Sequence, residues 1–295
     1  MTPEVMRQLS SVIAVSTVIM FVFSLALGVT VKQATWLLRR PGLLLRSVVA
    51  ALLLVPVVSI LLVFALDASA PVAIAVILLS VSPAAPLMLR KAADVSGDAD
   101  YAPGLQLALA LLSIATVPLS LQALSSLFPT VHVSVSVAEV AGQVGRAQLV
   151  PLLVGIAFRA IFPRAAARLA RPLGRIAGVL LAVVAVLVLL LQGKVLLLVG
   201  VGGYFAVAAA AAASLLLGHL LGGPDPVTRD ALAVACALRN PGLALLVIQL
   251  NFPARGAGAV VLTYILASGL LIAAYGAWRK NRRTPTPSGS ATAAT

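Results

Sequence analysis

Long apolar runs separated by short polar gaps dominate the sequence. A transmembrane helix needs about 20 consecutive residues that are mainly apolar. Nine runs are of this length, and they cover residues 9–31, 43–66, 71–90, 101–127, 137–161, 173–192, 194–221, 229–250 and 257–278. The pattern predicts an all-α polytopic membrane protein with nine transmembrane helices in residues 1–281. Residues 282–295 contain many Pro, Ser, Ala and Thr residues, and we expect them to form a disordered cytoplasmic tail.

Two of the nine runs are interrupted near their middle by residues that break helices. The third run contains Ser82-Pro83-Ala84-Ala85-Pro86, and the eighth contains Leu238-Arg239-Asn240-Pro241-Gly242. Proline removes a backbone donor, and glycine adds backbone freedom. Because these runs lie five places apart, they cross the membrane in opposite directions. This predicts an inverted repeat of four helices (9–127) and five helices (137–278), in which the third and eighth are discontinuous and cross each other.

Basic residues lie mainly in the gaps, and most of them fall on one predicted side of the membrane. If the C-terminus is cytoplasmic, sixteen of the twenty-one Lys and Arg residues lie on that side: Lys32, Arg39, Arg40, Arg46, Arg90, Lys91, Arg159, Arg164, Arg168, Arg171, Arg175, Arg229, Arg279, Lys280, Arg282 and Arg283. Cytoplasmic loops carry an excess of these residues. We therefore expect an inner-membrane protein with its N-terminus outside. The same placement accounts for the net charge of +13 and excludes nucleic acid as a partner.

A broken helix leaves backbone groups unpaired at the break. Carbonyls at the end of its first half can hold a cation, and N–H groups at the start of its second half favour an anion. Two such helices that cross in opposite directions place both kinds of group at one site. We expect a small organic anion to bind there, at Ser82, Pro83, Ala84, Arg239, Asn240, Pro241 and Gly242. The alternative is that Pro83 and Pro241 only kink packed helices.

Polar residues within the runs are the other candidates for function. Arg239 would be costly at membrane depth without a partner. No carboxylate is evident inside a run, so backbone carbonyls of the third run's break or an anionic substrate are the remaining partners. Three polar residues of the fifth run, Glu139, Gln143 and Arg146, share one helix face. They form either part of an ion or polar path, together with Gln106, or a satisfied polar face at a packed interface.

The two broken runs resemble those of the bile acid:sodium symporter family, whose members have nine or ten helices. The second broken helix of that family commonly reads Glu-x-Gly-Met-Gln-Asn-Ser-Gly-Leu-Ala, and residues 235–244 read Ala-Cys-Ala-Leu-Arg-Asn-Pro-Gly-Leu-Ala. Its first broken helix carries a Cys-Pro-Gly-Gly turn and a later Gly-Asp. Ser82-Pro83-Ala84-Ala85 and Gly97-Asp98 are similar to these. The resemblance implies a secondary active transporter of a carboxylate or a bile-acid-like anion. Its alternating access would take place around the crossing.

The sequence departs from the family at the residues that bind sodium. Alignment of the second block places the family's sodium-binding Glu on Ala235 and its Gln on Arg239, and Met88-Leu89 stand in place of a Ser-Asn pair. A cationic side chain at a sodium ligand position would repel the ion and supply its charge permanently. We therefore expect no cofactor, and no metal site follows from these residues. Our hypothesis is that the protein does not use the family's usual two-sodium coupling, while the coupling ion (sodium, proton or none) stays open.

Other functions remain as alternatives at this point. One is an exporter of the related arsenite type, for which Cys236 is the only thiolate available. Another is a membrane receptor or sensor that reuses the fold without transporting a solute. An enzyme is not expected, because the runs contain no HExxH, Gly-x-Ser-x-Gly or paired aspartates. The predicted partners are thus the lipid bilayer and a small organic anion, and nothing in the sequence favours a particular oligomeric state.

Overall fold

The described chain is built from helices, which are discontinuous where the sequence predicts breaks. A computed structural model describes residues 3–85, 87–96, 101–127, 137–252 and 256–283, and no strand occurs among them. The elements are α1 (Pro3–Gly28), α2 (Val31–Trp36), α3 (Pro41–Val48), the π-helical η1 (Val49–Leu54), α4 (Val55–Ala65), α5 (Ala70–Val81), α6 (Leu87–Ser96), α7 (Tyr101–Leu127), α8 (Val137–Ile161), α9 (Pro163–Leu198), α10 (Gly200–Leu221), α11 (Pro226–Ala237), α12 (Pro241–Asn251) and α13 (Ala257–Arg283).

Among the described residues, six helices are long and apolar enough to cross a membrane. They cover Pro41–Ala65, Tyr101–Gln122, Ala138–Ile161, Pro163–Leu191, Gly200–Leu221 and Ala257–Arg282. Three shorter apolar helices correspond to the first, third and eighth runs: Val12–Gly28, Ala70–Val81 and Pro241–Asn251. The third and eighth runs yield short helices because their breaks divide them. The chain is therefore a multi-pass helical membrane protein, while the count of nine spans, the inverted repeat and the orientation of the termini stay predictions.

Three predicted boundaries differ from the structure. The basic stretch from Arg164 to Arg175 is not a loop between spans, because it forms the first turns of α9. Its Ala, Arg and Leu residues are strong helix formers, so the helix continues beyond the apolar run. Lys194, which the sequence places at the start of the seventh run, lies near the end of α9 instead. The predicted tail begins at residue 282, but Arg282 and Arg283 belong to α13. Its residues 284–295 and Gly97-Asp98 lie outside the described residues.

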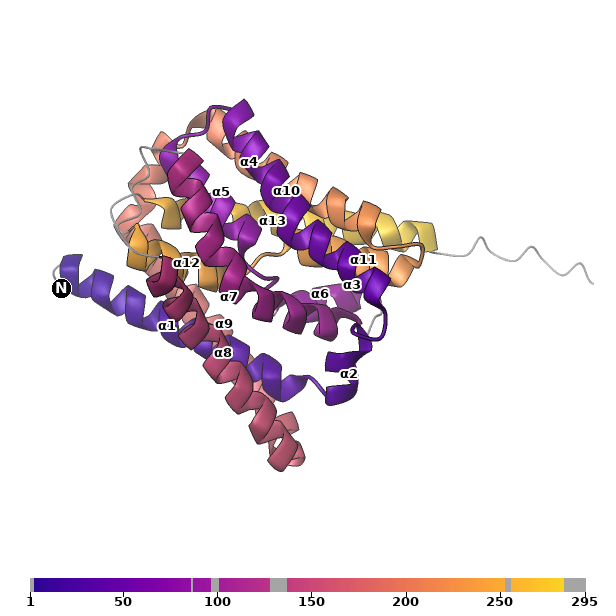
Figure 1. Cartoon of the computed structure of the whole chain (residues 1–295). Coiled ribbons are helices and arrows are strands. Elements are labelled where there is room, and N and C mark those ends of the chain that lie inside the picture. Colours follow the sequence, from indigo (N-terminus) through magenta and orange to yellow (C-terminus); the bar gives the residue numbers. More distant parts are fainter. Residues whose placement is uncertain (1–2, 86, 97–100, 128–136, 253–255, 284–295) are drawn as a thin grey trace, which may run out of the picture.

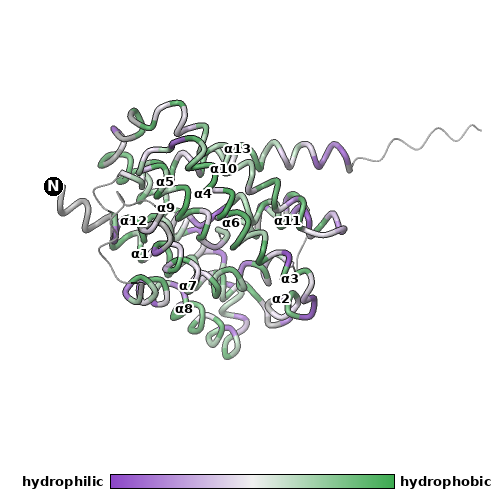
Figure 2. Tube along the Cα trace, turned by 45° about the horizontal axis from the view of Figure 1, so that its top comes forward, coloured by the Kyte–Doolittle hydropathy of each residue, from purple (hydrophilic) through white to green (hydrophobic). Residues whose placement is uncertain are grey.

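The helices pack around the two broken pairs, α5–α6 and α11–α12. On one side α1 lies against α8 and α9, and on the other α10 packs against α11 and α13 (Figure 1). Hydrophilic stretches gather at α2, α3, α11 and the end of α13, while the central parts of the helices are mainly hydrophobic (Figure 2). One apolar cluster contains the buried residues of α5 and α12, and a second contains those of η1, α6 and α11. The breaks lie where these two clusters meet.

Gly218 allows α10 to pack closely against α11. A Cβ atom added to Gly218 would lie 2.5 Å from the carbonyl oxygen of Leu232 and 2.7 Å from the Cα atom of Ala233. Real Cβ atoms do not approach backbone this closely, so any larger residue would push the helices apart. Small residues of this kind let membrane helices approach each other. Gly218 thus helps to set the position of α11 and, through it, of the second break.

Candidate functional site at the crossing of two broken helices

The two breaks meet and pair with each other through their backbones. Ala84 and Arg239 form an isolated antiparallel bridge. The N–H of Ala85 donates to the carbonyl oxygen of Leu238 at 2.8 Å, and the N–H of Asn240 donates to that of Pro83 at 2.8 Å. Exposed backbone at membrane depth is tolerated only where protein or a water-filled cavity satisfies it. Here each break supplies the partners of the other, which confirms that the discontinuous helices cross.

Local sequence explains where each helix stops and starts. Ser82 ends α5 in an extended conformation (φ −65°, ψ 147°), as expected of a residue that precedes a proline. In the second break Pro241 is the first residue of α12, where its missing N–H is no loss. Asn240 caps this helix, and its Oδ1 accepts from the N–H of Leu243 at 3.2 Å. The motif Asn240-Pro241 therefore both interrupts the eighth apolar run and starts α12.

Arg239 lies inside this crossing and is held by backbone carbonyls of two other segments. Its side chain is 2% exposed. Nη1 donates to the carbonyl oxygen of Ser82 at 3.2 Å, and Nη2 donates to that of Ala51 at 2.7 Å. Among the described residues no carboxylate pairs with it, and its Nε has no hydrogen-bond partner. The predicted partner, a carbonyl at the first break, is thus present, and a second carbonyl from η1 joins it.

The carbonyl of Ala51 is available because the helix around it is π-helical. The N–H of Val55 donates to the carbonyl oxygen of Ala50, five residues back, rather than to Ala51. The next residue, Pro56, has no N–H to offer. Neither of the residues that would ordinarily donate to Ala51 does so, and its oxygen is left for Arg239. This acceptor was not predicted from the sequence. The presence of Pro56 inside the second apolar run could have indicated it.

Two further side chains bind to the breaks from neighbouring helices. Gln106 of α7 is 2% exposed, and its Nε2 donates to the carbonyl oxygen of Ala84, while its Oε1 has no partner. Tyr264 of α13 donates to the carbonyl oxygen of Ala237 at 3.2 Å. Gln106 was among the predicted candidates, although no motif placed it. Tyr264 was missed, because its partner is a backbone atom that leaves no pattern in the sequence.

The predicted site residues fall into two groups. Ser82, Pro83, Ala84, Arg239, Asn240, Pro241 and Gly242 lie together at the crossing with Gln106, and all of them are buried. The hydroxyl of Ser82 donates a hydrogen bond to the carbonyl oxygen of Leu78, one turn earlier, at 2.7 Å. The polar residues of α8 do not reach this group.

The polar face of α8 lies elsewhere and is largely exposed. Gln143 is half-buried, and its Oε1 accepts from Nδ2 of Asn251 at 3.3 Å, at the end of α12. Glu139 and Arg146 are exposed on the same helix. This arrangement ties α8 to α12, and the predicted polar path through these residues stays a prediction.

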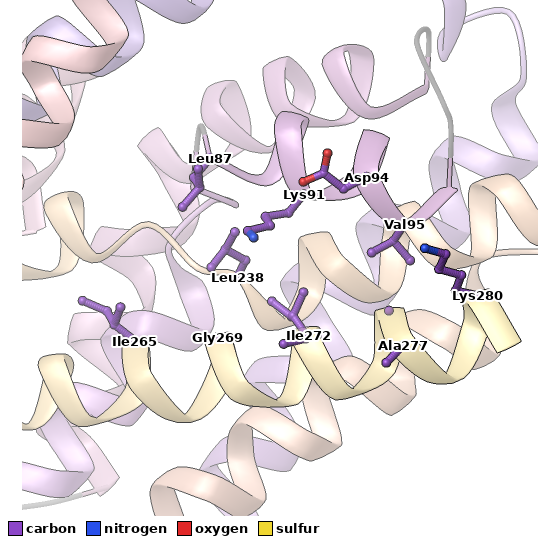
Figure 3. Close-up of a pocket in the computed structure, with 12 residues that line it drawn as sticks. Leu87, Lys91, Asp94, Val95, Leu238, Ile265, Gly269, Ile272, Ala277 and Lys280 are labelled. Atoms are coloured by element: carbon purple, nitrogen blue, oxygen red, sulfur yellow. The ribbon is translucent and has the colours of Figure 1, made fainter.

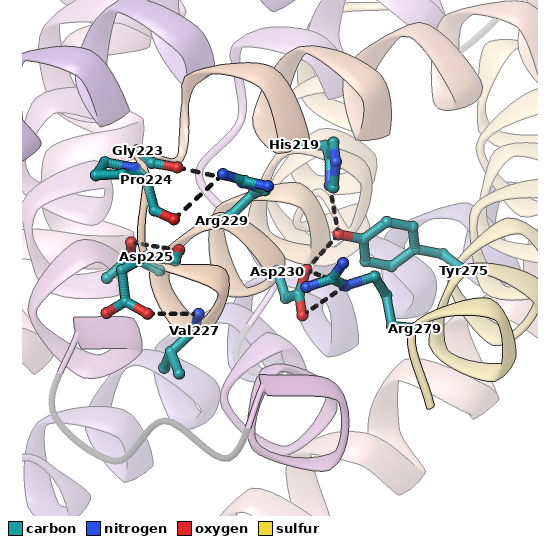
Figure 4. A network of polar contacts seen from close by, with 10 residues as sticks. His219, Gly223, Pro224, Asp225, Val227, Arg229, Asp230, Tyr275 and Arg279 are labelled. Carbon is teal, nitrogen blue, oxygen red and sulfur yellow. Dashed lines mark hydrogen bonds and ion pairs between the residues drawn. The ribbon is translucent and has the colours of Figure 1, made fainter. Parts of the chain in front are cut away.

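A second polar cluster anchors the start of α11. Asp230 is fully buried; Oδ1 accepts from the hydroxyl of Tyr275 at 2.6 Å, and Oδ2 accepts from Nε of Arg279 at 2.9 Å (Figure 4). The same hydroxyl lies 2.7 Å from Nδ1 of His219 in α10. Asp225 caps α11 by accepting from the N–H of Val227 at 2.9 Å. These contacts fix α11 against α10 and α13, which holds the second break in place.

Together, the fold and the site define a helical membrane protein of the transporter type, with two discontinuous helices that cross at a buried cation. The model of the sodium bile acid symporter family matches residues 15–198. The chain belongs to this family. Membership makes it a membrane transporter of the bile acid or organic anion type. No curated protein matches the chain.

The match includes the first break and ends at Leu198, the last residue of α9, before the second break begins. The correspondence of Ala235 and Arg239 with sodium ligands therefore rests on the motif alone. Neither side chain can supply an oxygen ligand to sodium. Ala235 is fully buried and carries no oxygen in its side chain, and the carbonyls of Ser82 and Ala51 already accept from a guanidinium. The donor set does not fit a sodium ion at Arg239.

Proposed function

We propose that the protein is a secondary active transporter of a small organic anion that works without sodium coupling. The anion would bind at the crossing of the two breaks, and alternating access would take place around that point. Family membership supports the general class of transporter. The proposal adds the binding site and the absence of sodium as the coupling ion.

The hydrogen bonds of Arg239 to two backbone carbonyl oxygens are the observation that supports this proposal. Carbonyl oxygens at broken helices commonly coordinate the driving cation in transporters. In this chain one such oxygen, that of Ser82, accepts from Nη1 of Arg239, and a second carbonyl oxygen, that of Ala51 in η1, accepts from Nη2. The guanidinium brings a permanent positive charge to the crossing, where a soluble cation would otherwise supply it. Its unpartnered Nε leaves a buried donor that an oxyanion can satisfy.

An arsenite-type exporter is less well supported. Cys236 is fully buried on α11, and the described residues contain no group of three or more His, Cys, Asp and Glu side chains. A receptor that does not transport has no observation in its favour, and it becomes an outcome of the test below.

Transport by purified protein in proteoliposomes tests the proposal. We expect uptake of at least one of lactate, succinate and taurocholate, at the same rate with an inward sodium gradient as with potassium on both sides. Arg239→Gln should abolish this uptake, and Arg168→Gln, an exposed arginine of α9, should leave it unchanged. The variant Ala235→Glu/Arg239→Gln restores both family residues, so any uptake it retains should depend on sodium.

Two results would contradict the proposal. Stoichiometric uptake of sodium with the anion by the unmodified protein would refute the absence of coupling. Stable binding of an anion without flux, unchanged in Arg239→Gln, would favour a receptor and would remove Arg239 from the site.

A further inference from the structure

A groove between α6 and α13 leads from the end of α13 to the second break. It has a volume of about 550 Å³. Leu238, the residue before Arg239, lines it beside Ile265 and Gly269 of α13 (Figure 3). Lys91, Asp94 and Lys280 also line the groove; the amino group of Lys91 points toward Leu238, and Lys280 lies near the end of α13. The groove is thus mainly apolar along α13, with Lys280 at its far end.

The shape of the groove follows from small residues on α13. Gly269, Ala273 and Gly276 have a spacing of four and three residues, which places them on one helix face. A Cβ atom added to Gly269 would meet no atom within 4 Å, so the space in front of it is open. Next to this face, Leu266 and Leu270 are 69% and 74% exposed. In a helix that spans the bilayer, such side chains face lipid, and the groove therefore opens toward lipid.

Neither lysine of the groove, Lys91 or Lys280, forms an ion pair within the part of the chain that the structure describes. Among these residues Asp94, three residues after Lys91, does not pair with it. By contrast, Arg279 is paired with Asp230. A lysine facing hydrocarbon costs about 2.5–3.5 kcal/mol at the centre of a bilayer. In Figure 3 the amino group of Lys91 points along the groove toward Leu238, so an anionic group in the groove would remove much of this cost.

The length of the groove matches one leaflet. Ile265 and Lys280 are fifteen residues apart on α13, or about 22 Å along the helix axis. Half of a bilayer with its headgroup regions is about 20–22 Å thick. An amphiphile with its chain toward Leu238 and its headgroup toward Lys280 would fill this length. A small soluble anion would leave the apolar part of the groove empty.

We propose that this groove binds an anionic phospholipid from the leaflet that surrounds the end of α13. One acyl chain lies along Gly269 and Ile272, and the phosphate lies between Lys91 and Lys280. The chain ends against Leu238, so the lipid is in contact with the second break. This site is separate from the crossing, and the proposal does not depend on which solute the protein transports.

Native mass spectrometry of the purified protein with added lipid tests the site. The probes are palmitoyl-oleoyl phosphatidylglycerol, which is anionic, and palmitoyl-oleoyl phosphatidylcholine, which has no net charge. Each lysine near an anionic lipid contributes about 1 kcal/mol, or about a fivefold change in affinity. We expect phosphatidylglycerol to bind more tightly, and Lys91→Gln/Lys280→Gln to lower its affinity by about 25-fold. Lys32→Gln, an exposed lysine of α2, is the matched control and should change nothing.

A second pair of variants tests the apolar half of the groove. Gly269→Leu should fill it and reduce binding of both lipids, while Gly178→Leu, on α9 and equally open, should not. Equal affinity for the two lipids, or unchanged binding in the lysine double variant, would overturn the proposal. Displacement of phosphatidylglycerol by soluble glycerol 3-phosphate would overturn it as well, because it would show that the groove recognises a free anion.

Discussion

Replacement of Arg239 by methionine separates the structural role of the guanidinium from its role as a fixed charge. The side chain is 2% exposed and donates to two carbonyl oxygens, at 3.2 Å and 2.7 Å. Methionine is also long and unbranched, and its flexible side chain adapts to irregular space in a core. It therefore fills most of the same volume while removing the charge and every donor.

Two opposing effects set the change in the free energy of unfolding. Hydrogen bonds from a charged group contribute about 1.5–3 kcal/mol each, so the pair stabilises the fold by about 3–6 kcal/mol. An arginine at membrane depth costs about 2.5–3.5 kcal/mol on insertion scales. The two largely offset each other, and we expect Arg239→Met to destabilise the fold by at most about 3.5 kcal/mol. That corresponds to a fall in Tm of no more than about 14 °C.

Thermal unfolding in detergent, followed by intrinsic fluorescence with and without the transported anion, measures both roles. Arg239→Met should melt near the unmodified protein and lose the rise in Tm that the anion causes. The comparison variant is Arg279→Met, which leaves the fully buried Asp230 without its cationic partner. Loss of one partner of a buried pair costs about 3–5 kcal/mol, so this variant should be the less stable. If Arg239→Met is the less stable of the two, or still responds to the anion, the guanidinium is a structural element and the reasoning fails.

Two further variants test how the breaks are positioned. Gly218→Ala should lower the free energy of unfolding by about 1–3 kcal/mol, because the new Cβ would collide with the backbone of α11; Gly178→Ala has open space and should be neutral or slightly stabilising. Equal melting temperatures for these two variants would show that α10 and α11 can separate freely. Asn240→Ala should cost about 1 kcal/mol through loss of the cap of α12, and Asn240→Asp should recover it, as measured by urea unfolding. Identical stability of the alanine and aspartate variants would exclude a capping role.

Much of the fold could be predicted because membrane insertion depends on local composition. The runs at 101–127 and 137–161 have the same bounds as α7 and α8. Both breaks were predicted, since proline acts on the residues next to it whatever the tertiary structure. The predicted start of α9 was wrong because a helix can begin before its apolar run when the residues in front of that run also favour helix.

The site was predicted in outline, and its missing parts have a common cause. Arg239 was expected to need a partner, and the partners proved to be backbone oxygens of Ser82 and Ala51. Every residue type has a backbone carbonyl oxygen, so no pattern of side chains predicts which one will accept from Arg239. The role of Glu139 could not be predicted either, because spacing shows that residues share a face of a helix but not what that face meets.

The covalent attachment of Arg239 has an electrical consequence for the proposed cycle. A soluble cation crosses with its substrate and cancels the charge of the anion, whereas a guanidinium stays with the protein. Each turnover with a monovalent anion would then move one net negative charge across the membrane. Moving one charge through 100 mV is worth about 2.3 kcal/mol, which is about a fiftyfold ratio of concentrations at equilibrium. With the cell interior negative, this transporter would drive its anion outward unless the inward gradient of that anion exceeds this ratio.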